Sequence, residues 1–189
     1  WELTSPVPWH ADLERDRRAR IKRIESDLFW AYKFAPEMAE MHEVRATTAE
    51  ECWPLLSNTM SVVNFDICHG LKPYGEWLLA QDMEWAYAEY RRMLQMLLWR
   101  VPAEQLVLKC PEHLWFVDSL LKVFPDACIV WTHRAPFDCI ASYSSMISLS
   151  RRTLQGRIVP EEIGPHITDR FNTGVTRAMA ARAAHGDES

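Results

Sequence analysis

Glycine is scarce in this sequence, and no segment is rich in it. The 189 residues contain six glycines, and each stands alone in the chain. A disordered linker or a glycine-rich repeat would need many more of them. We therefore expect an ordered chain without internal repeats.

Closely spaced cysteine pairs and long apolar runs are also missing. No C-x-x-C pair occurs among the cysteines, so the sequence indicates neither a zinc site nor a redox pair. We expect buried free thiols in a reducing cytosol, and hence a cytoplasmic protein. No apolar run approaches the ~20 residues of a membrane span, so we expect no transmembrane segment. We also identify no signal peptide. The cysteines are Cys52, Cys68, Cys110, Cys128 and Cys139.

An excess of positive charge is absent as well, because the formal net charge is −5. That balance argues against a nucleic-acid-binding protein, which would need a basic excess on one face. It still allows a polyanionic small ligand, because a few local donors decide such binding.

The chain is well supplied with apolar and aromatic residues. Apolar residues make up 48% of the sequence and charged residues 25%, as in ordinary soluble domains. Nine tryptophans are many for this length, and they predict a well-packed body. The length suits one domain with a substantial core.

The first hundred residues are expected to be largely helical. Apolar positions recur at three- and four-residue steps over residues 11–34, among many charged residues. Thr48 and Glu51 match a capping box, which predicts a helix over about 49–58. Residues 59–75 are expected to form loop and short extended structure, and residues 83–100 a long, largely buried helix.

The pattern changes after residue 104. Residues 105–110 and 127–132 are short apolar runs, typical of strands buried on both faces of a parallel sheet. Helical spacing follows each run, over 113–124 and over 136–150. This βαβα order predicts an α/β fold, with a parallel sheet flanked by helices. Residues 160–182 are expected to form one or two further helices.

Arg134 and Ser142 are candidates for an anion-binding site. Arg134 lies in the turn between the predicted strand 127–132 and the helix that begins near Pro136. Ligands of open α/β sheets bind at the carboxyl ends of strands, and the free N–H groups of a helix N-terminus attract anions. Arg134 could hold a phosphate by two hydrogen bonds, and Ser142 follows about two turns into the helix. The alternative is a surface arginine and a helix-face serine that share no ligand.

The segment Leu106–Met146 carries a family resemblance through the string LVLKCPEHLWFVDSLLKVFPDACIVWTHRAPFDCIASYSSM. It resembles the central block of the sulfotransferases that depend on 3′-phosphoadenosine 5′-phosphosulfate (PAPS), particularly the bacterial branch. The resemblance implies a P-loop NTPase-like sulfotransferase fold, PAPS as cosubstrate and 3′-phosphoadenosine 5′-phosphate (PAP) as product. It also implies that Arg134 and Ser142 bind the 3′-phosphate. Ala135 and Cys110 replace the Asp and Ser common in the family, but neither change removes a phosphate donor.

Lys109, Glu112 and His113 are the candidate catalytic residues. A lysine ammonium can stabilise charge on a bridging or leaving oxygen, and a histidine can take the proton of an acceptor hydroxyl. Lys109 and His113 resemble the Lys and His of the family, although the cytosolic animal enzymes place the His two residues after the Lys, and here the interval is four. Glu112 and His42 are the alternative bases.

Three other features bear on the candidate residues. His69 and His133 are expected to be structural. The resemblance implies an acceptor that carries a hydroxyl group: a small molecule, a sugar or a lipid. It implies no metal ion. Aromatic residues could line an apolar acceptor site, although aromatics at helical spacing are more often core. These aromatics are Trp30, Tyr32, Phe34, Trp77, Trp85 and Tyr87.

The donor loop of the family is absent from this sequence. In the family, a G-x-P-R-S-G-T-like loop cradles the 5′-phosphosulfate with backbone N–H groups. The chain begins at Trp1 without an initiator methionine, so we expect an incomplete sulfotransferase domain that is inefficient by itself. Its expected parts are a helical acceptor-side region (1–104), a core with the 3′-phosphate site (105–150) and a helical tail (151–189).

Two other functions stay open. The chain could be a non-catalytic binding or interaction module that retains the sulfotransferase fold. It could also be related to P-loop kinases, which share the architecture. The lack of a G-K-[ST] string and of an acidic Mg²⁺-binding string counts against a kinase.

Overall fold

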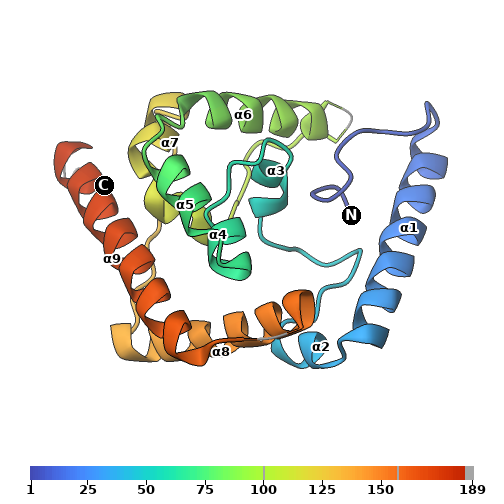
Figure 1. Ribbon diagram of the computed structural model, residues 1–189. Coiled ribbons are helices and arrows are strands. Elements are labelled where there is room, and N and C mark those ends of the chain that lie inside the picture. The colour runs from blue at the N-terminus through green and yellow to red at the C-terminus, as the bar shows by residue number, and fades with distance from the viewer. Residues whose placement is uncertain (100, 157, 186–189) are drawn as a thin grey trace. The chain divides into compact units, whose positions relative to one another are not determined.

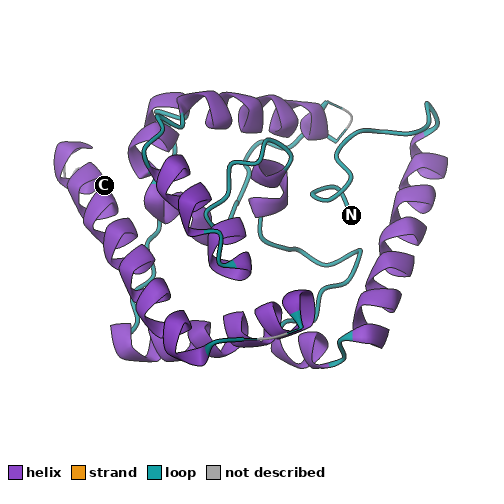
Figure 2. Ribbon diagram, in the orientation of Figure 1, coloured by secondary structure: helices purple, strands orange, loops and turns teal. Residues whose placement is uncertain are grey.

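A computed structural model describes the chain over residues 1–99, 101–156 and 158–185, except for the side chains of residues 40 and 41. Over these residues the chain forms helices and loops, and Figure 2 shows no strand among them. The elements are α1 (Leu13–Phe34), α2 (Glu37–Met41), α3 (Trp53–Ser57), α4 (Asn64–His69), α5 (Lys72–Leu79), α6 (Glu84–Leu98), the 3-10 helix η1 (Pro111–Trp115), α7 (Val117–Val123), α8 (Pro136–Gln155) and α9 (Pro160–His185).

The chain divides into two compact units, each built from two stretches of sequence. The first unit comprises Trp1–Met60 and Ala88–Cys110, and the second comprises Ser61–Tyr87 and Pro111–Ser189. The division falls within α6, after Tyr87. Figure 1 labels the helices of both units along the chain.

In the first unit, the chain ahead of α1 is tied to the start of that helix. Asp12 caps α1, because its Oδ1 accepts a hydrogen bond from the N–H of Arg15 at 2.7 Å. The buried Asp16 accepts hydrogen bonds from the N–H of His10 at 3.0 Å and from Nε of Arg20 at 2.8 Å. Burial alone would raise the pKa of Asp16, but the backbone N–H bonds and the Arg20 guanidinium outweigh it and lower the pKa.

In the second unit, α9 packs against α8, η1 and α7, and α4 packs against α5 and α8. Apart from the adjacent pair His166 and Ile167, the buried residues of α9 lie three or four positions apart, so one face of this long helix is turned to the core. They are Ile163, His166, Ile167, Arg170, Gly174, Ala178 and Ala181. Two of the elements in this unit bear candidate site residues. Glu112 and His113 lie in η1, and Ser142 lies in α8.

Most of the predicted helices are confirmed. The helices expected over 11–34, 83–100 and 136–150 are α1, α6 and α8. The helix expected over 113–124 is divided into η1 and α7, and the region 160–182 lies in the single helix α9. Amphipathic spacing therefore located the long helices.

The prediction for residues 48–75 is only partly confirmed, because the helix expected over 49–58 is the shorter α3. Thr48 does not cap a helix: α3 begins at Trp53, and the hydroxyl of Thr48 donates to the carbonyl oxygen of Arg45 at 3.2 Å. Residues 59–75, expected to be loop, contain α4 and the start of α5. A helix as short as α4 depends on tertiary contacts for its stability, and local sequence does not reveal those contacts.

The expected strands 105–110 and 127–132 are extended loop segments in the described part of the chain. Val107 is 92% exposed and Val130 is 83% exposed, so neither side chain is buried as a central strand would require. A strand exists only where a neighbouring strand completes its hydrogen bonds, and an apolar run does not by itself supply that neighbour. The predicted parallel sheet is therefore not found among the described residues.

Candidate functional site

The loop before α8 and the first turns of that helix carry the predicted anion site. Ala135 is the N-cap residue and Pro136 opens the helix, so the unpaired N–H groups of the first turn face the loop that bears Arg134. Arg134 and Ser142 are both exposed to solvent. An arginine two residues before Pro136, at an open helix N-terminus, suits a phosphate, and both predicted residues are exposed.

His113 lies in η1 and is half-buried. Its Nδ1 atom is 3.0 Å from the hydroxyl of Tyr87, a buried residue of α6, and the two ring centroids are 5.7 Å apart. This contact orients the imidazole. If Nε2 is to accept a proton, Nδ1 must carry the ring hydrogen and donate it to the hydroxyl of Tyr87.

Glu112 is buried next to the N-terminus of α4. Its Oε2 accepts a hydrogen bond from the N–H of Val63 at 2.7 Å, and its Oε1 accepts one from the N–H of Asn64 at 2.9 Å. Val63 is the N-cap residue of α4 and has no side-chain cap of its own. Glu112 supplies that cap from η1, so its carboxylate fastens η1 to α4.

Lys109 belongs to the first unit and its side chain is exposed. Its ammonium forms an ion pair with Glu51, and its carbonyl oxygen accepts a hydrogen bond from the N–H of Cys52 at 3.0 Å. An anionic ligand of Lys109 would have to share or displace the carboxylate of Glu51. The sequence had drawn attention to Glu51 only as part of a capping box, so this role was missed.

Three other histidines contact residues close to them in sequence: the alternative base His42, and His69 and His133, which were expected to be structural. His42 Nε2 lies 2.9 Å from a carboxylate oxygen of Glu50. The ring of His69 is tilted against an aromatic ring of the same helix, α4, at 6.4 Å between centroids. The ring of His133 stacks on Trp131 at 5.0 Å. Each of the three rings therefore has a structural contact.

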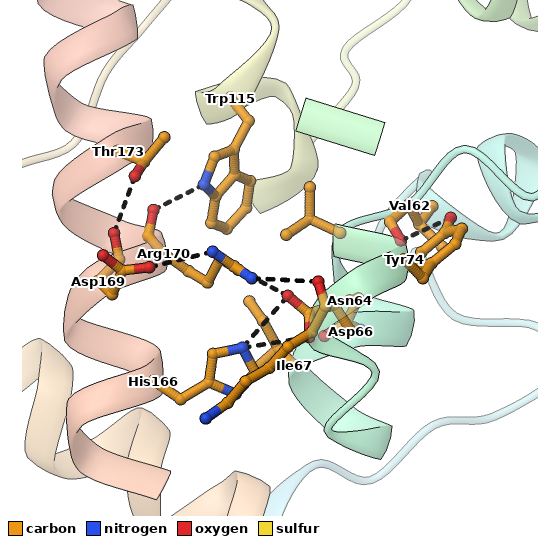
Figure 3. A network of polar contacts seen from close by, with 12 residues as sticks. Val62, Asn64, Asp66, Ile67, Tyr74, Trp115, His166, Asp169, Arg170 and Thr173 are labelled. Carbon is orange, nitrogen blue, oxygen red and sulfur yellow. Dashed lines mark hydrogen bonds and ion pairs between the residues drawn. The ribbon is translucent and has the colours of Figure 1, made fainter. Parts of the chain in front are cut away.

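A buried polar network joins α4, α8 and α9 (Figure 3). Asp66 of α4 is fully buried and pairs with Arg170 of α9, with 2.6 Å between Nε and Oδ2. His166, one turn earlier on α9, places Nε2 3.1 Å from Oδ1 of Asp66. Arg151 of α8 donates to Nδ1 of His166 at 2.9 Å and to the carbonyl oxygen of Ile67 at 2.7 Å. The three helices are thus linked by charged side chains.

The protonation states in this network follow from its donors. Because an arginine offers only N–H donors, Nδ1 of His166 accepts and Nε2 carries the hydrogen directed at Asp66. Burial alone would raise the pKa of Asp66, but the hydrogen bonds from His166 and Arg170 outweigh it and lower the pKa. The network was missed by sequence analysis, and the available signal was an Asp within the apolar stretch 62–67.

The aromatic candidates for an acceptor site are divided between surface and interior. Tyr87 is buried, and the hydroxyl of the half-buried Tyr32 donates to the carbonyl oxygen of Val44 at 3.0 Å. The exposed aromatics are Trp30, Phe34, Trp77 and Trp85. On α1, Trp30 stacks on Phe34 at 6.1 Å and lies under the ammonium of Lys33.

All five cysteines are free. Cys52 is buried as expected, but Cys128 is exposed, and the other three are half-buried. The expected burial is wrong for Cys128 because residues 127–132 do not pack as a strand.

Comparison with known proteins identifies the family. A profile described as "Sulfotransferase family" matches residues 3–189. The chain belongs to the sulfotransferase family. This sulfotransferase chain is similar to the crystal structure of sulfotransferase STF1 from Mycobacterium tuberculosis, with a TM-score of 0.80 and 27% sequence identity. The resemblance noted in Leu106–Met146 is thereby confirmed.

The structural similarity covers 96% of this chain and 50% of the mycobacterial chain. The sulfotransferase chain therefore spans about half the length of that protein. A search of curated proteins finds no match. Within the described residues, none of the helices is both long enough and apolar enough to cross a membrane.

Proposed function

We propose that this chain is part of an enzyme that transfers a sulfuryl group from PAPS to a hydroxyl of a small-molecule, sugar or lipid acceptor. Membership of the sulfotransferase family supports the reaction class. The observation that carries the proposal is the exposed Arg134 at the open N-terminus of α8, with the exposed Ser142 on the same helix.

In this proposal the 3′-phosphate of PAPS binds at the start of α8. The unpaired N–H groups of the first turn and the positive end of the helix dipole favour an anion there. Arg134 holds the phosphate by charge-assisted hydrogen bonds, and the hydroxyl of Ser142 adds a further donor. The net negative charge of the chain does not oppose this binding, because the local donors decide it.

The transfer breaks the bond between sulfur and the 5′-phosphate oxygen of PAPS and forms a bond between sulfur and the acceptor oxygen. The acceptor proton passes to Nε2 of His113, whose Nδ1–H donates to the hydroxyl of Tyr87. Lys109, released from Glu51, stabilises the charge that develops on the leaving phosphate oxygen. The products are PAP and the sulfate ester of the acceptor.

We also propose that the extended segments 105–110 and 127–132 act as strands of a parallel sheet once they are paired. Both segments are apolar and extended, and Val107 and Val130 are well exposed. Central strands of parallel sheets have this near-continuous apolar composition.

The nucleotide proposal is tested by calorimetric titration of the chain with PAP. Arg134→Ala should weaken binding by about 2 kcal/mol, the scale of a charge-assisted contact, and Ser142→Ala by about 1 kcal/mol. Arg152→Ala is the matched control, because Arg152 is an exposed arginine in the last turn of the same helix. It should leave the affinity for PAP unchanged.

The same titration distinguishes the enzyme from the alternative, a non-catalytic interaction module. If the wild-type chain binds no PAP, the proposal fails and a non-catalytic interaction module is favoured. If PAP binds but Arg134→Ala and Arg152→Ala weaken binding equally, the 3′-phosphate is not held where we place it.

A further inference from the structure

Two residues that adjoin proposed site residues are fastened to the same short helix. Glu112 precedes His113 in η1, and Tyr143 follows Ser142 in α8. Glu112 accepts a hydrogen bond from the backbone N–H of Asn64 at 2.9 Å, and the hydroxyl of Tyr143 donates to Oδ1 of Asn64 at 3.0 Å. One residue of α4 therefore contacts both η1 and α8.

The surroundings fix Asn64 in this orientation. The thiol of Cys68, one turn along α4, donates to the same Oδ1 at 3.2 Å. Burial raises the pKa of this thiol, so it remains a protonated donor. The ring of Tyr143 packs edge-to-face on Phe171 of α9 at 5.2 Å between centroids. The oxygen of Asn64 is thus held between two donors, one of which is held by α9.

We propose that Asn64, Glu112 and Tyr143 are positioning residues that hold η1 and the N-terminal turns of α8 on α4 as a common support. The inference rests on the proposed function, because the placement of Ser142 matters only if PAP binds there. It also assigns Glu112: its carboxylate acts through α4 and not as the base that takes the acceptor proton.

The far end of α4 offers a matched control. The side-chain amide of Gln155 donates to the carbonyl oxygen of His69 at 2.6 Å, so it joins the same two helices. Gln155 lies 13 residues beyond Ser142, or ~20 Å along the helix axis. Removing this contact loosens α4 from α8 without disturbing the helix near Ser142.

The direct test compares Tyr143→Phe, which removes only a hydroxyl, with Gln155→Ala in calorimetric titrations with PAP. We expect Tyr143→Phe to lower the affinity for PAP ~5-fold, the effect of one lost hydrogen bond on Ser142 placement. Gln155→Ala should leave the affinity unchanged. In the Ser142→Ala background, Tyr143→Phe should have no further effect, because a positioning residue acts through the residue it places.

Glu112→Gln tests the other contact. It replaces one accepting oxygen with an NH₂ group that faces a backbone N–H, so α4 and its Asn64 should be held less firmly. The affinity for PAP should fall, and in the Tyr143→Phe background it should fall no further. Far-UV circular dichroism establishes whether each variant is folded. If Glu112→Gln is unfolded, the test of the inference rests on Tyr143→Phe.

The inference is overturned if Tyr143→Phe binds PAP as tightly as the wild type. It is also overturned if its effect persists undiminished in the Ser142→Ala background, because the hydroxyl would then not act through Ser142. If the wild-type chain binds no PAP, the proposed function itself fails and the inference falls with it. The wild-type titration comes first, so failure of the proposed function is distinguished from failure of the inference.

Discussion

Asp66 shows how a single residue in this chain depends on distant sequence. Its carboxylate is held by His166 and Arg170, which lie 100 and 104 residues further along the chain. The sequence around Asp66 does not predict these partners. The contacts of Asn64 with Glu112 and of Tyr87 with His113 also join residues that are distant in sequence, so no local pattern could predict them.

Asp66→Asn should destabilise the chain by about 3–5 kcal/mol at pH 7, because it removes the buried counter-charge of Arg170 and leaves its guanidinium only the exposed carboxylate of Asp169. The free energy of unfolding is measured by urea denaturation. Asp118→Asn is the control, since Asp118 is an exposed carboxylate next to Lys122. The control should cost less than ~1 kcal/mol.

The effect of Asp66→Asn should also depend on pH. The pKa of Asp66 in the folded chain lies below that in the unfolded chain, which is ~3.9. Ionised Asp66 therefore stabilises the fold fully above that value, and the stabilisation is lost as the pH falls through the folded pKa. The difference between wild type and variant should shrink below about pH 4. An equal difference at pH 7 and pH 3 would contradict the assignment of an ionised Asp66.

Gly75 is required by the close approach of α5 to Asp66. A Cβ added at Gly75 would lie 2.8 Å from the Cβ of Asp66 and closer still to its carboxylate. Gly75→Ala should lower the free energy of unfolding by about 1–3 kcal/mol, as overpacking does. At Gly164, an added Cβ meets open space, so Gly164→Ala should change stability by no more than ~1 kcal/mol. Thermal unfolding of the two variants makes the comparison, and equal stabilities would show that Gly75 is not confined.

At the scale of elements, a helix could be predicted when the signals that favour it lie within its own sequence. α6 and α8 could be predicted because their apolar spacing, and for α8 the position of Pro136, are local signals. α4 could not, because its N-terminus is capped by Glu112, which lies 48 residues from Asn64 in sequence. The two expected strands failed for a related reason, since a strand is defined by a neighbour that its own sequence does not specify.

The extended segment 127–132 leads to a prediction about self-association. An exposed apolar segment with the composition of a strand favours pairing with another chain, and a charge on it should oppose that pairing. Val130→Lys should therefore reduce association at high protein concentration, measured by light scattering, with unchanged helix content. Val175→Lys introduces the same charge at an exposed position of α9 and should have a smaller effect. Equal effects of the two substitutions would show that only net charge matters.

At the scale of the whole chain, family membership was accessible from sequence, while the packing around the candidate residues was not. The string that contains Arg134 and Ser142 predicted the family that the profile match identifies. The structure adds that η1 and α8 share contacts with α4, and that Lys109 is paired with Glu51. Such supports come from packing between segments distant in sequence, so no pattern within one segment could predict them.

The central claim, that Arg134 recognises the 3′-phosphate, is tested most directly by titrating two ligands that differ only in that group. PAP and adenosine 5′-phosphate should each be titrated calorimetrically into the wild type and into Arg134→Ala. A charge-assisted hydrogen bond of ~1.5–3 kcal/mol predicts that the wild type prefers PAP by ~10-fold or more, and that Arg134→Ala loses most of this preference. Equal affinity of the wild type for the two nucleotides, or an undiminished preference in Arg134→Ala, would contradict the account.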